Sequence, residues 1–306
     1  MKVVSSILLV FALYAYAWPQ NASNPSTNSQ TSGWTRVVSN DGEFSIEVPV
    51  KHTFFADQAG FIVGNNSNDF ELKNMYMLTA YINGTLVSFE VFDGSKGAFD
   101  ALYDVDALDK SGRSATTKKS DRAKIKEVIN STNTYYSIRR FINTKSHIYV
   151  VTAANRKGET AELKRFLNSL VINDGSSPKL DGVAFSSLQP QQVTINYAAP
   201  TPKTNLVSPV PTPTPDPAVR PLVVLRVTRG SYLPLARKHN LQGAVVLKVV
   251  MAANGSIPEI TVVNSLPDGL DRQSIFAALR TKFLPKEKND APVNVTKTLE
   301  FNYNIY

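Results

Sequence analysis

Few residues in this 306-residue chain could carry out chemistry, and they are widely separated. There is no cysteine, which excludes disulfides, thiol nucleophiles and thiolate metal sites. His52, His147 and His239 stand alone on strand or loop patterns, where a structural or solvated role is the usual one. The chain has no G-x-S-x-G, no H-E-x-x-H, no phosphate-binding glycine loop and no dinucleotide fingerprint. We therefore predict no catalytic residue, no metal ligand and no cofactor, and we do not expect an enzyme.

Basic residues are the next candidates for binding chemistry. The net charge of +8 gives a general preference for anionic surroundings. Within residues 113–126 the positive charges are Arg113, Lys118, Lys119, Arg122, Lys124 and Lys126. No aromatic residue lies between them to stack on a base, so the segment indicates a solvated basic loop and not a nucleic-acid site. A weak contact of this loop with a membrane surface stays open.

The end of the chain carries the clearest pattern. From residue 293 onward apolar side chains alternate with polar ones, and the apolar set is Val293, Val295, Leu299, Phe301, Tyr303 and Ile305. This period of two predicts a strand with one buried face. The polar alternate face and the position at the chain end indicate that the strand lies at a sheet edge.

The elements before this strand complete a small unit. Two apolar runs at residues 243–251 and 256–264 flank Asn254-Gly255, a pair typical of a primed hairpin turn. A helix follows, with Ile275, Ala278 and Leu279 on its packing face. Residues 221–306 therefore predict a ββαβ domain.

This unit resembles the C-terminal domain of the TonB energy transducers. The resemblance rests on Tyr232 with Pro234 and Ala236-Arg237, Gly243, Asn254-Gly255, Ser265-Leu266, Leu270-Asp271, Phe283-x-Pro285, Pro292-Val293 and the aromatic final strand. Leu233 separates the tyrosine and proline that the family usually joins.

The resemblance implies that the domain pairs, as one strand with another, with an extended segment of an outer-membrane transporter. The matching positions are the terminal strand and the turn from Arg229 to Tyr232. The candidate partner-binding residues are Arg229, Ser231, Tyr232, Thr298, Glu300 and Asn302. For Leu299, Phe301 and Tyr303 we expect a role in the core.

Residues 33–174 predict a separate N-terminal domain. Asp41-Gly42 and Asn83-Gly84 mark hairpins between apolar runs, and residues 160–170 have the periodicity of an amphipathic helix. The order of elements, with FSIEVP early and RFLNSLVI late, resembles small secreted α/β domains related to PsbP and Mog1 over residues 33–173. The fold class is therefore α+β, with an antiparallel sheet and packed helices in this domain.

Two segments are predicted to lie outside the domains. Residues 1–17 have the lysine, apolar run and small-x-small ending of a signal peptide, followed by a disordered tract at 18–32. Residues 175–220 accumulate proline and predict a semi-rigid polyproline linker. Within it, residues 193–197 read as a strand that either neighbouring domain could accept.

Together these features predict an exported periplasmic protein that binds an extended peptide of an outer-membrane partner. One alternative is a membrane-tethered energy transducer whose N-terminal segment is not cleaved. Another is a ligand-binding N-terminal domain for which the TonB-like module serves only in docking. A homodimer formed through the terminal strand also stays open.

Overall fold

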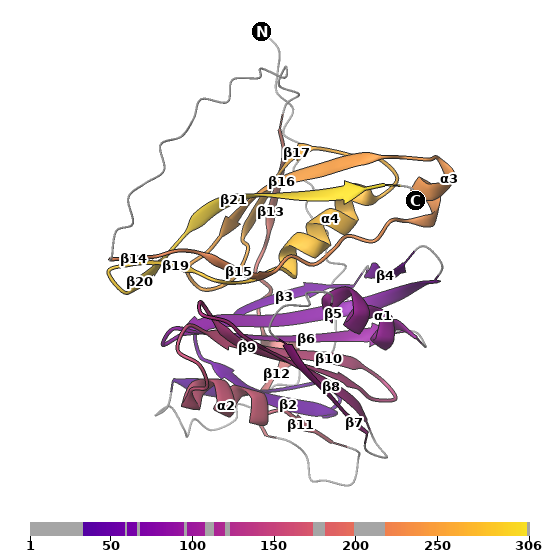
Figure 1. Cartoon of the computed structure of the whole chain (residues 1–306). Helices are drawn as coiled ribbons and strands as arrows, with labels where there is room; N and C mark the ends of the chain where they lie inside the picture. The colour runs from indigo at the N-terminus through magenta and orange to yellow at the C-terminus, as the bar shows by residue number, and fades with distance from the viewer. Residues whose placement is uncertain are drawn as a thin grey trace.

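The computed structural model describes residues 33–58, 60–65, 68–94, 97–107, 113–119, 123–173, 181–198 and 218–304. The predicted signal peptide and disordered tract lie outside these residues, as do most prolines of the predicted linker, in 199–217. We call the described residues up to 188 the N-terminal half and residues 218–304 the C-terminal half. Figure 1 shows the N-terminal half in the lower layers and the C-terminal half above them.

A large antiparallel sheet forms the middle of the molecule. Its order is β3-β5-β6-β10-β9-β8-β7, and β4 also pairs with β5. The strands are β3 (Thr53–Asp57), β4 (Phe61–Asn65), β5 (Asn68–Ile82), β6 (Thr85–Gly94), β7 (Arg113–Lys119), β8 (Lys124–Ser131), β9 (Tyr136–Asn143) and β10 (Ile148–Asn155). Asn83 and Gly84 join β5 to β6 with φ values of 49° and 77°, the left-handed pair that a type I′ turn requires.

One face of this sheet is covered by N-terminal elements. These are β1 (Trp34–Val38), β2 (Phe44–Pro49), β11 (Val171–Ile172), β12 (Val183–Ala184) and α2 (Ala161–Asn168). Thr160 caps α2 by accepting a bond from the Leu163 amide at 3.3 Å. The helix buries Leu163, Phe166 and Leu167, as the periodicity predicts. The described part of 33–173 is thus an antiparallel sheet with packed helices, and the resemblance to PsbP and Mog1 stays a prediction.

The predicted basic loop at 113–126 is wrong, because the chain forms the hairpin β7–β8 there. β-Branched residues such as Thr116, Thr117 and Ile125 favour strand, and the positive charges do not prevent it. Lys124 and Lys126 lie 2.7 and 2.9 Å from the Asp100 carboxylate on α1 (Ala98–Ala107). Both lysines are therefore used in a contact within the molecule.

The segment predicted as a linker is partly built into the fold. β12 pairs in parallel with β1, and the short 3₁₀-helix η1 (Phe185–Ser187) buries Phe185 against the rings of Phe44 and Phe54, each 5.4 Å away. Strand β13 (Thr194–Tyr197) then joins the C-terminal sheet. A few apolar residues between the prolines pack into the two cores and fix this segment. The proline-rich composition of the segment as a whole does not reveal them.

The C-terminal half is built on a second sheet, in the order β13-β17-β16-β21. Its own elements are β14 (Val219–Arg220), β15 (Val223–Arg226), α3 (Pro234–Lys238), β16 (Gly243–Met251), β17 (Glu259–Asn264), α4 (Leu270–Leu279), β18 (Lys282–Leu284), β19 (Lys286–Lys288), β20 (Ala291–Val293) and β21 (Val295–Tyr303). The run β16-β17-α4-β21 is the ββαβ order expected from the sequence. The turn from β16 to β17 differs from the predicted primed type, because only Gly255 and not Asn254 is left-handed.

Candidate partner-binding edge

The terminal strand β21 lies at a sheet edge. It pairs with β16 over nine residues, from Val295 to Tyr303, and among the described residues no strand pairs with its other side. Figure 1 shows it in yellow along the front of the upper half. An edge strand of this length presents unpaired main-chain N–H and C=O groups to any extended segment beside it.

The side chains of β21 divide between two faces. Leu299, Phe301 and Tyr303 are buried in the core of the C-terminal half, as expected. Burial raises the pKa of Tyr303 to about 12, and its hydroxyl donates to the Leu270 carbonyl at 3.3 Å. The opposite face is exposed and carries three of the candidate residues, Thr298, Glu300 and Asn302.

The turn from Arg229 to Tyr232 lies against the buried face at the C-terminal end of β21. The Tyr232 ring is 5.9 Å from the Tyr303 ring, and its hydroxyl donates to the Leu241 carbonyl. Gly230 allows this approach, since a Cβ there would lie 2.2 Å from the Tyr303 hydroxyl oxygen. Arg229 is exposed, whereas Ser231 is buried and is a poor contact for a partner. The six candidates thus form two groups, on opposite faces of one edge.

At the other side of the same sheet, β13 covers β17 and is itself a short edge strand of four residues. β13 runs parallel to β17, with Thr194 opposite Glu259 and Tyr197 opposite Val262. The Thr194 amide donates to the Pro258 carbonyl at 3.0 Å, and the Ala198 amide donates to the Val262 carbonyl at 2.9 Å. The chain therefore occupies its own β17 edge and leaves β21 open.

Helix α4 supports the sheet and is buried on both sides. Eight of its ten residues are buried, among them Ile275 and Ala278 in the core beneath the sheet. Phe276 faces the other way and stacks on Phe61 of β4, with the ring centroids 5.7 Å apart. The sequence predicted a single packing face, because the second face is defined only by the N-terminal sheet.

A buried carboxylate anchors the end of α4 to that sheet. Glu90 of β6 accepts a hydrogen bond from Arg280 Nε at 2.9 Å and lies 2.8 Å from Lys282 Nζ. Arg139 of β9 is 3.9 Å away. The side chains of Glu90 and Arg280 have no exposed surface, and the Arg280 guanidinium lies 5.1 and 5.2 Å from the ring centroids of Phe61 and Phe92.

The electrostatics of this cluster keep Glu90 ionised. Burial alone raises the pKa of Glu90, but Arg280, Lys282 and Arg139 outweigh it and lower the pKa to about 2. Burial also lowers the pKa of Lys282, and the attraction of Glu90 offsets only part of that effect. This site was not predicted from the sequence, and the charged residue inside the apolar run TLVSFEVF is the signal that could have revealed it.

Further contacts fix the two ends of the C-terminal half. At one end Arg156 donates to the carbonyls of Pro221 and Pro285 at 2.8 and 2.9 Å. The Gly255 turn also packs there, where a Cβ would lie 2.6 Å from Leu86 Cδ1. At the other end Arg237 of α3 pairs with Asp69 of β5. The two halves therefore meet across a wide, ordered interface.

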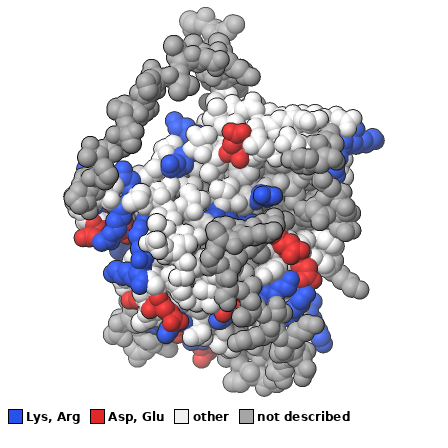
Figure 2. Space-filling model, in the orientation of Figure 1, with Lys and Arg blue, Asp and Glu red and all other residues white. Residues whose placement is uncertain are grey.

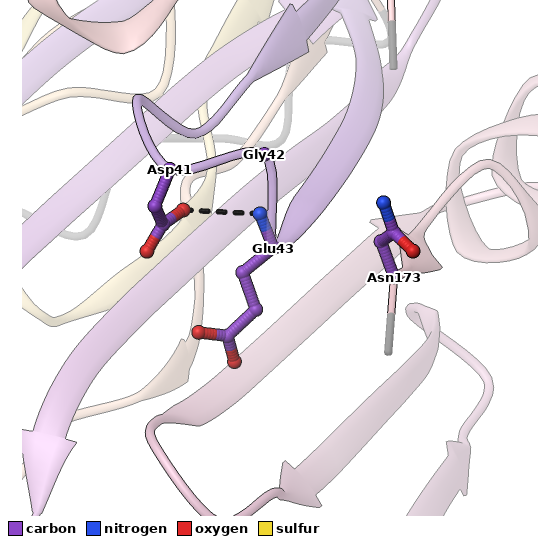
Figure 3. Close-up of a pocket in the computed structure, with 4 residues that line it drawn as sticks. All are labelled: Asp41, Gly42, Glu43 and Asn173. Carbon is purple, nitrogen blue, oxygen red and sulfur yellow. Dashed lines mark hydrogen bonds between the residues drawn. The ribbon is translucent and has the colours of Figure 1, made fainter. Parts of the chain in front are cut away.

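The histidines are in three different places. His147 lies between Glu43 and Asp93, at 2.9 and 3.1 Å, next to an open pocket lined by Asp41, Gly42, Glu43 and Asn173 (Figure 3). His52 contacts the Pro49 carbonyl and His239 contacts Asp268. Across the described ranges no three His, Cys, Asp or Glu side chains are grouped to hold a metal ion.

On the face seen in Figure 2, the C-terminal half carries few charged residues, and most of its visible atoms are white. A strand that pairs there would depend on main-chain bonds and on shape more than on ion pairs. None of the helices in the described ranges is both long and apolar enough to span a membrane.

Comparison with known proteins identifies a family for part of the chain. No curated protein matches the chain. A family model does match residues 229–305, and its description is Gram-negative bacterial TonB protein C-terminal. The matched segment contains α3, α4 and the strands from β16 to β21, including the open edge. Residues 229–305 thus match the TonB C-terminal domain family, as the resemblance over residues 221–306 predicted.

Proposed function

We propose that this protein is an exported, periplasmic, non-catalytic interaction protein that binds an extended segment of an outer-membrane transporter by strand pairing at β21. The observation that carries the proposal is the asymmetry of the sheet's two edge strands, because β13 has only four residues whereas β21 is open along nine. The family match supports the class of partner, and the signal-like segment at residues 1–17 supports export.

A peptide paired along β21 would cover a length of roughly 30 Å, at ~3.3 Å per residue. Its main chain would supply affinity by bonding the open groups of the strand. Its side chains would point alternately to the two faces of the sheet. One set would pass Thr298, Glu300 and Asn302, and the other set would lie on the side of Tyr232, so residues of both groups, apart from the buried Ser231, would contact the same ligand.

The test is isothermal calorimetry of the full chain with synthetic peptides from the N-terminal segments of the host's outer-membrane transporters. Each binding peptide is then made in two N-methylated forms, one with methyl groups on the odd residues and one on the even residues. These two forms have the same number of methyl groups. An edge bonds only every second residue of an added strand.

Strand pairing predicts that one methylated form loses binding and the other retains it. Equal loss with both forms, equal retention with both, or no binding by any transporter peptide would contradict the proposal.

The TonB family match also fits an energy transducer, and the mature N-terminus separates the two roles. Mass spectrometry of the exported chain is expected to show that it begins at Trp18. An intact chain that begins at Met1 and remains in the inner membrane would favour the tethered transducer.

A further inference from the structure

The strand that covers β17 belongs to a segment that comes from the N-terminal half. We call this segment, residues 185–197, the strap. Phe185 is buried in the N-terminal core, and Leu188 packs against the same core. The Gln191 amide then donates to the Phe54 carbonyl on β3 at 2.6 Å. The chain is therefore fixed to the N-terminal sheet only a few residues before β13 begins at Thr194.

The strap ends as a strand of the other half. Val193 and Ile195 are partly buried against the C-terminal core, beside β17 residues such as Ile260. The side chains of Thr194, Asn196 and Tyr197 are exposed, so these two apolar residues and the main-chain bonds hold the strand. Because the anchor at Gln191 is so close, β13 is presented to β17 at a high effective concentration.

The opposite side of the C-terminal half also relies on the N-terminal sheet. Helix α4 is buried on both sides, so each side must pack against another part of the molecule. Phe276 packs on Phe61, and both Arg280 and Lys282 pair with the Glu90 carboxylate. The segment that matches the TonB family contains neither β13 nor this cover.

We propose that the N-terminal half is a permanent partner of the TonB-like domain and completes its fold. It donates β13 to the sheet of that domain, and its buried Glu90, which we call the charged socket, pairs with Arg280 and Lys282 at the end of α4. The two halves form one folding unit that does not depend on the covalent connection between β13 and β14. The partner surface for α4 and β17 is thus the N-terminal half of the same chain, which leaves β21 as the long edge of the sheet that other molecules can reach. This inference is independent of the peptide that binds at β21.

The experiment cuts the chain between the two halves. A recognition site for a specific protease is placed within residues 199–217, so that the N-terminal fragment keeps β13 and the C-terminal fragment begins before β14. After cleavage of the folded protein, we expect the fragments to co-elute in size-exclusion chromatography and to unfold in a single thermal transition. Amide hydrogen exchange of β17 should stay as slow as in the uncut chain.

Two pairs of variants, tested in the cut protein, identify the contacts responsible. Ile195→Asp should increase the rate at which the fragments separate at least tenfold, whereas Asn196→Asp, on the same strand but exposed, should leave it unchanged. Glu90→Gln should likewise accelerate separation, whereas Glu47→Gln, at a partly exposed ion pair with Arg36, should not. Dye-labelled fragments allow the rates to be read by fluorescence transfer.

Two results would overturn the proposal. The first is separation of the cut wild-type fragments in ordinary buffer with the C-terminal fragment still folded, because the TonB-like domain would then need no partner. The second is equal separation rates for Ile195→Asp and Asn196→Asp together with equal rates for Glu90→Gln and Glu47→Gln, because neither β13 nor the socket would then hold the halves.

Discussion

The C-terminal sheet ends in two different edge strands, the four-residue β13 beside β17 and the nine-residue β21 beside β16. β17 is paired with β13, which the chain supplies from a segment rich in proline, while β21 is paired on one side only among the described residues. Folded proteins usually cover, shorten or charge a strand edge to prevent unwanted pairing. Here β17 is covered, the edge strand β13 that covers it has only four residues, and the nine-residue β21 is the long open edge of the sheet.

The two faces of the sheet differ in a related way. The face toward α4 is apolar, and the end of α4 is held by the buried Glu90 cluster, whereas the outer face of β21 carries the exposed residues Thr298, Glu300 and Asn302. The covered side fixes the position of the sheet, and the open side is the one that we propose for recognition. Substitutions on the two sides should therefore separate stability from binding.

The largest effect is expected for Glu90→Gln on the covered side. The substitution leaves Arg280, Lys282 and Arg139 together in a buried site without their anion, and removal of one partner of such a cluster costs about 3–5 kcal/mol of unfolding free energy. Urea denaturation of the full chain measures the loss. Glu47→Gln is the control, because its ion pairs with Arg36 and Arg165 are partly exposed and should contribute less than about 1 kcal/mol. Equal losses in the two variants would show that the Glu90 cluster does not hold the halves.

The same cluster predicts a pH dependence. The pKa of Glu90 is about 2 in the folded chain and near 4.5 in the unfolded chain, so its stabilising effect is complete above pH 4.5 and is lost as the pH falls toward 2. The difference in unfolding free energy between the wild type and Glu90→Gln should therefore shrink over that range. Denaturation series at several pH values between 2 and 6 measure it, and a difference that stays constant would contradict the ionised state of Glu90.

A smaller loss of stability is expected when the covered edge is opened. Ile195→Asp places a charge against the C-terminal core and should lower the unfolding free energy by roughly 1–3 kcal/mol. Hydrogen exchange should become faster at β17 and stay unchanged at β21. If Asn196→Asp, whose side chain is exposed, has the same effect on β17, then the contact made by Ile195 does not hold β13 in place.

The smallest change in stability is expected on the open side. Thr298→Lys and Thr261→Lys are matched, because both residues lie opposite Lys248 in the sheet register and each new charge would meet the same neighbour. Each should cost less than about 1 kcal/mol of stability. Only Thr298→Lys should weaken binding of the transporter peptide, by about tenfold, or roughly 1.4 kcal/mol. A similar loss of binding in Thr261→Lys would place the peptide elsewhere.

Local patterns predicted a good part of this fold. Alternation gave the terminal strand and its buried residues, helical spacing gave Leu163, Phe166 and Leu167 on α2, and Asn83-Gly84 gave a hairpin. Such signals depend on neighbours in the chain, so a single sequence displays them.

The remaining features depend on residues that are far apart in the chain. Glu90 and Arg280 are 190 positions apart in the chain, and neither local pattern indicates that the two residues are partners. The choice of β17 as the partner of β13 and the second buried face of α4 likewise arise only when the two halves meet. In the candidate site, the exposure of Thr298, Glu300 and Asn302 followed from alternation, but the burial of Ser231 beneath the turn did not.

Amide hydrogen exchange of the full chain, with and without a transporter peptide, tests the central claim most directly. Without peptide, the outward-facing amides of β21 should exchange quickly and those of β17 slowly, because β13 covers only the second edge. With peptide, new protection should appear along β21 between Val295 and Tyr303 while β13 and β17 stay unchanged. Protection that appears on β17 together with release of β13, or no new protection on β21, would contradict the account.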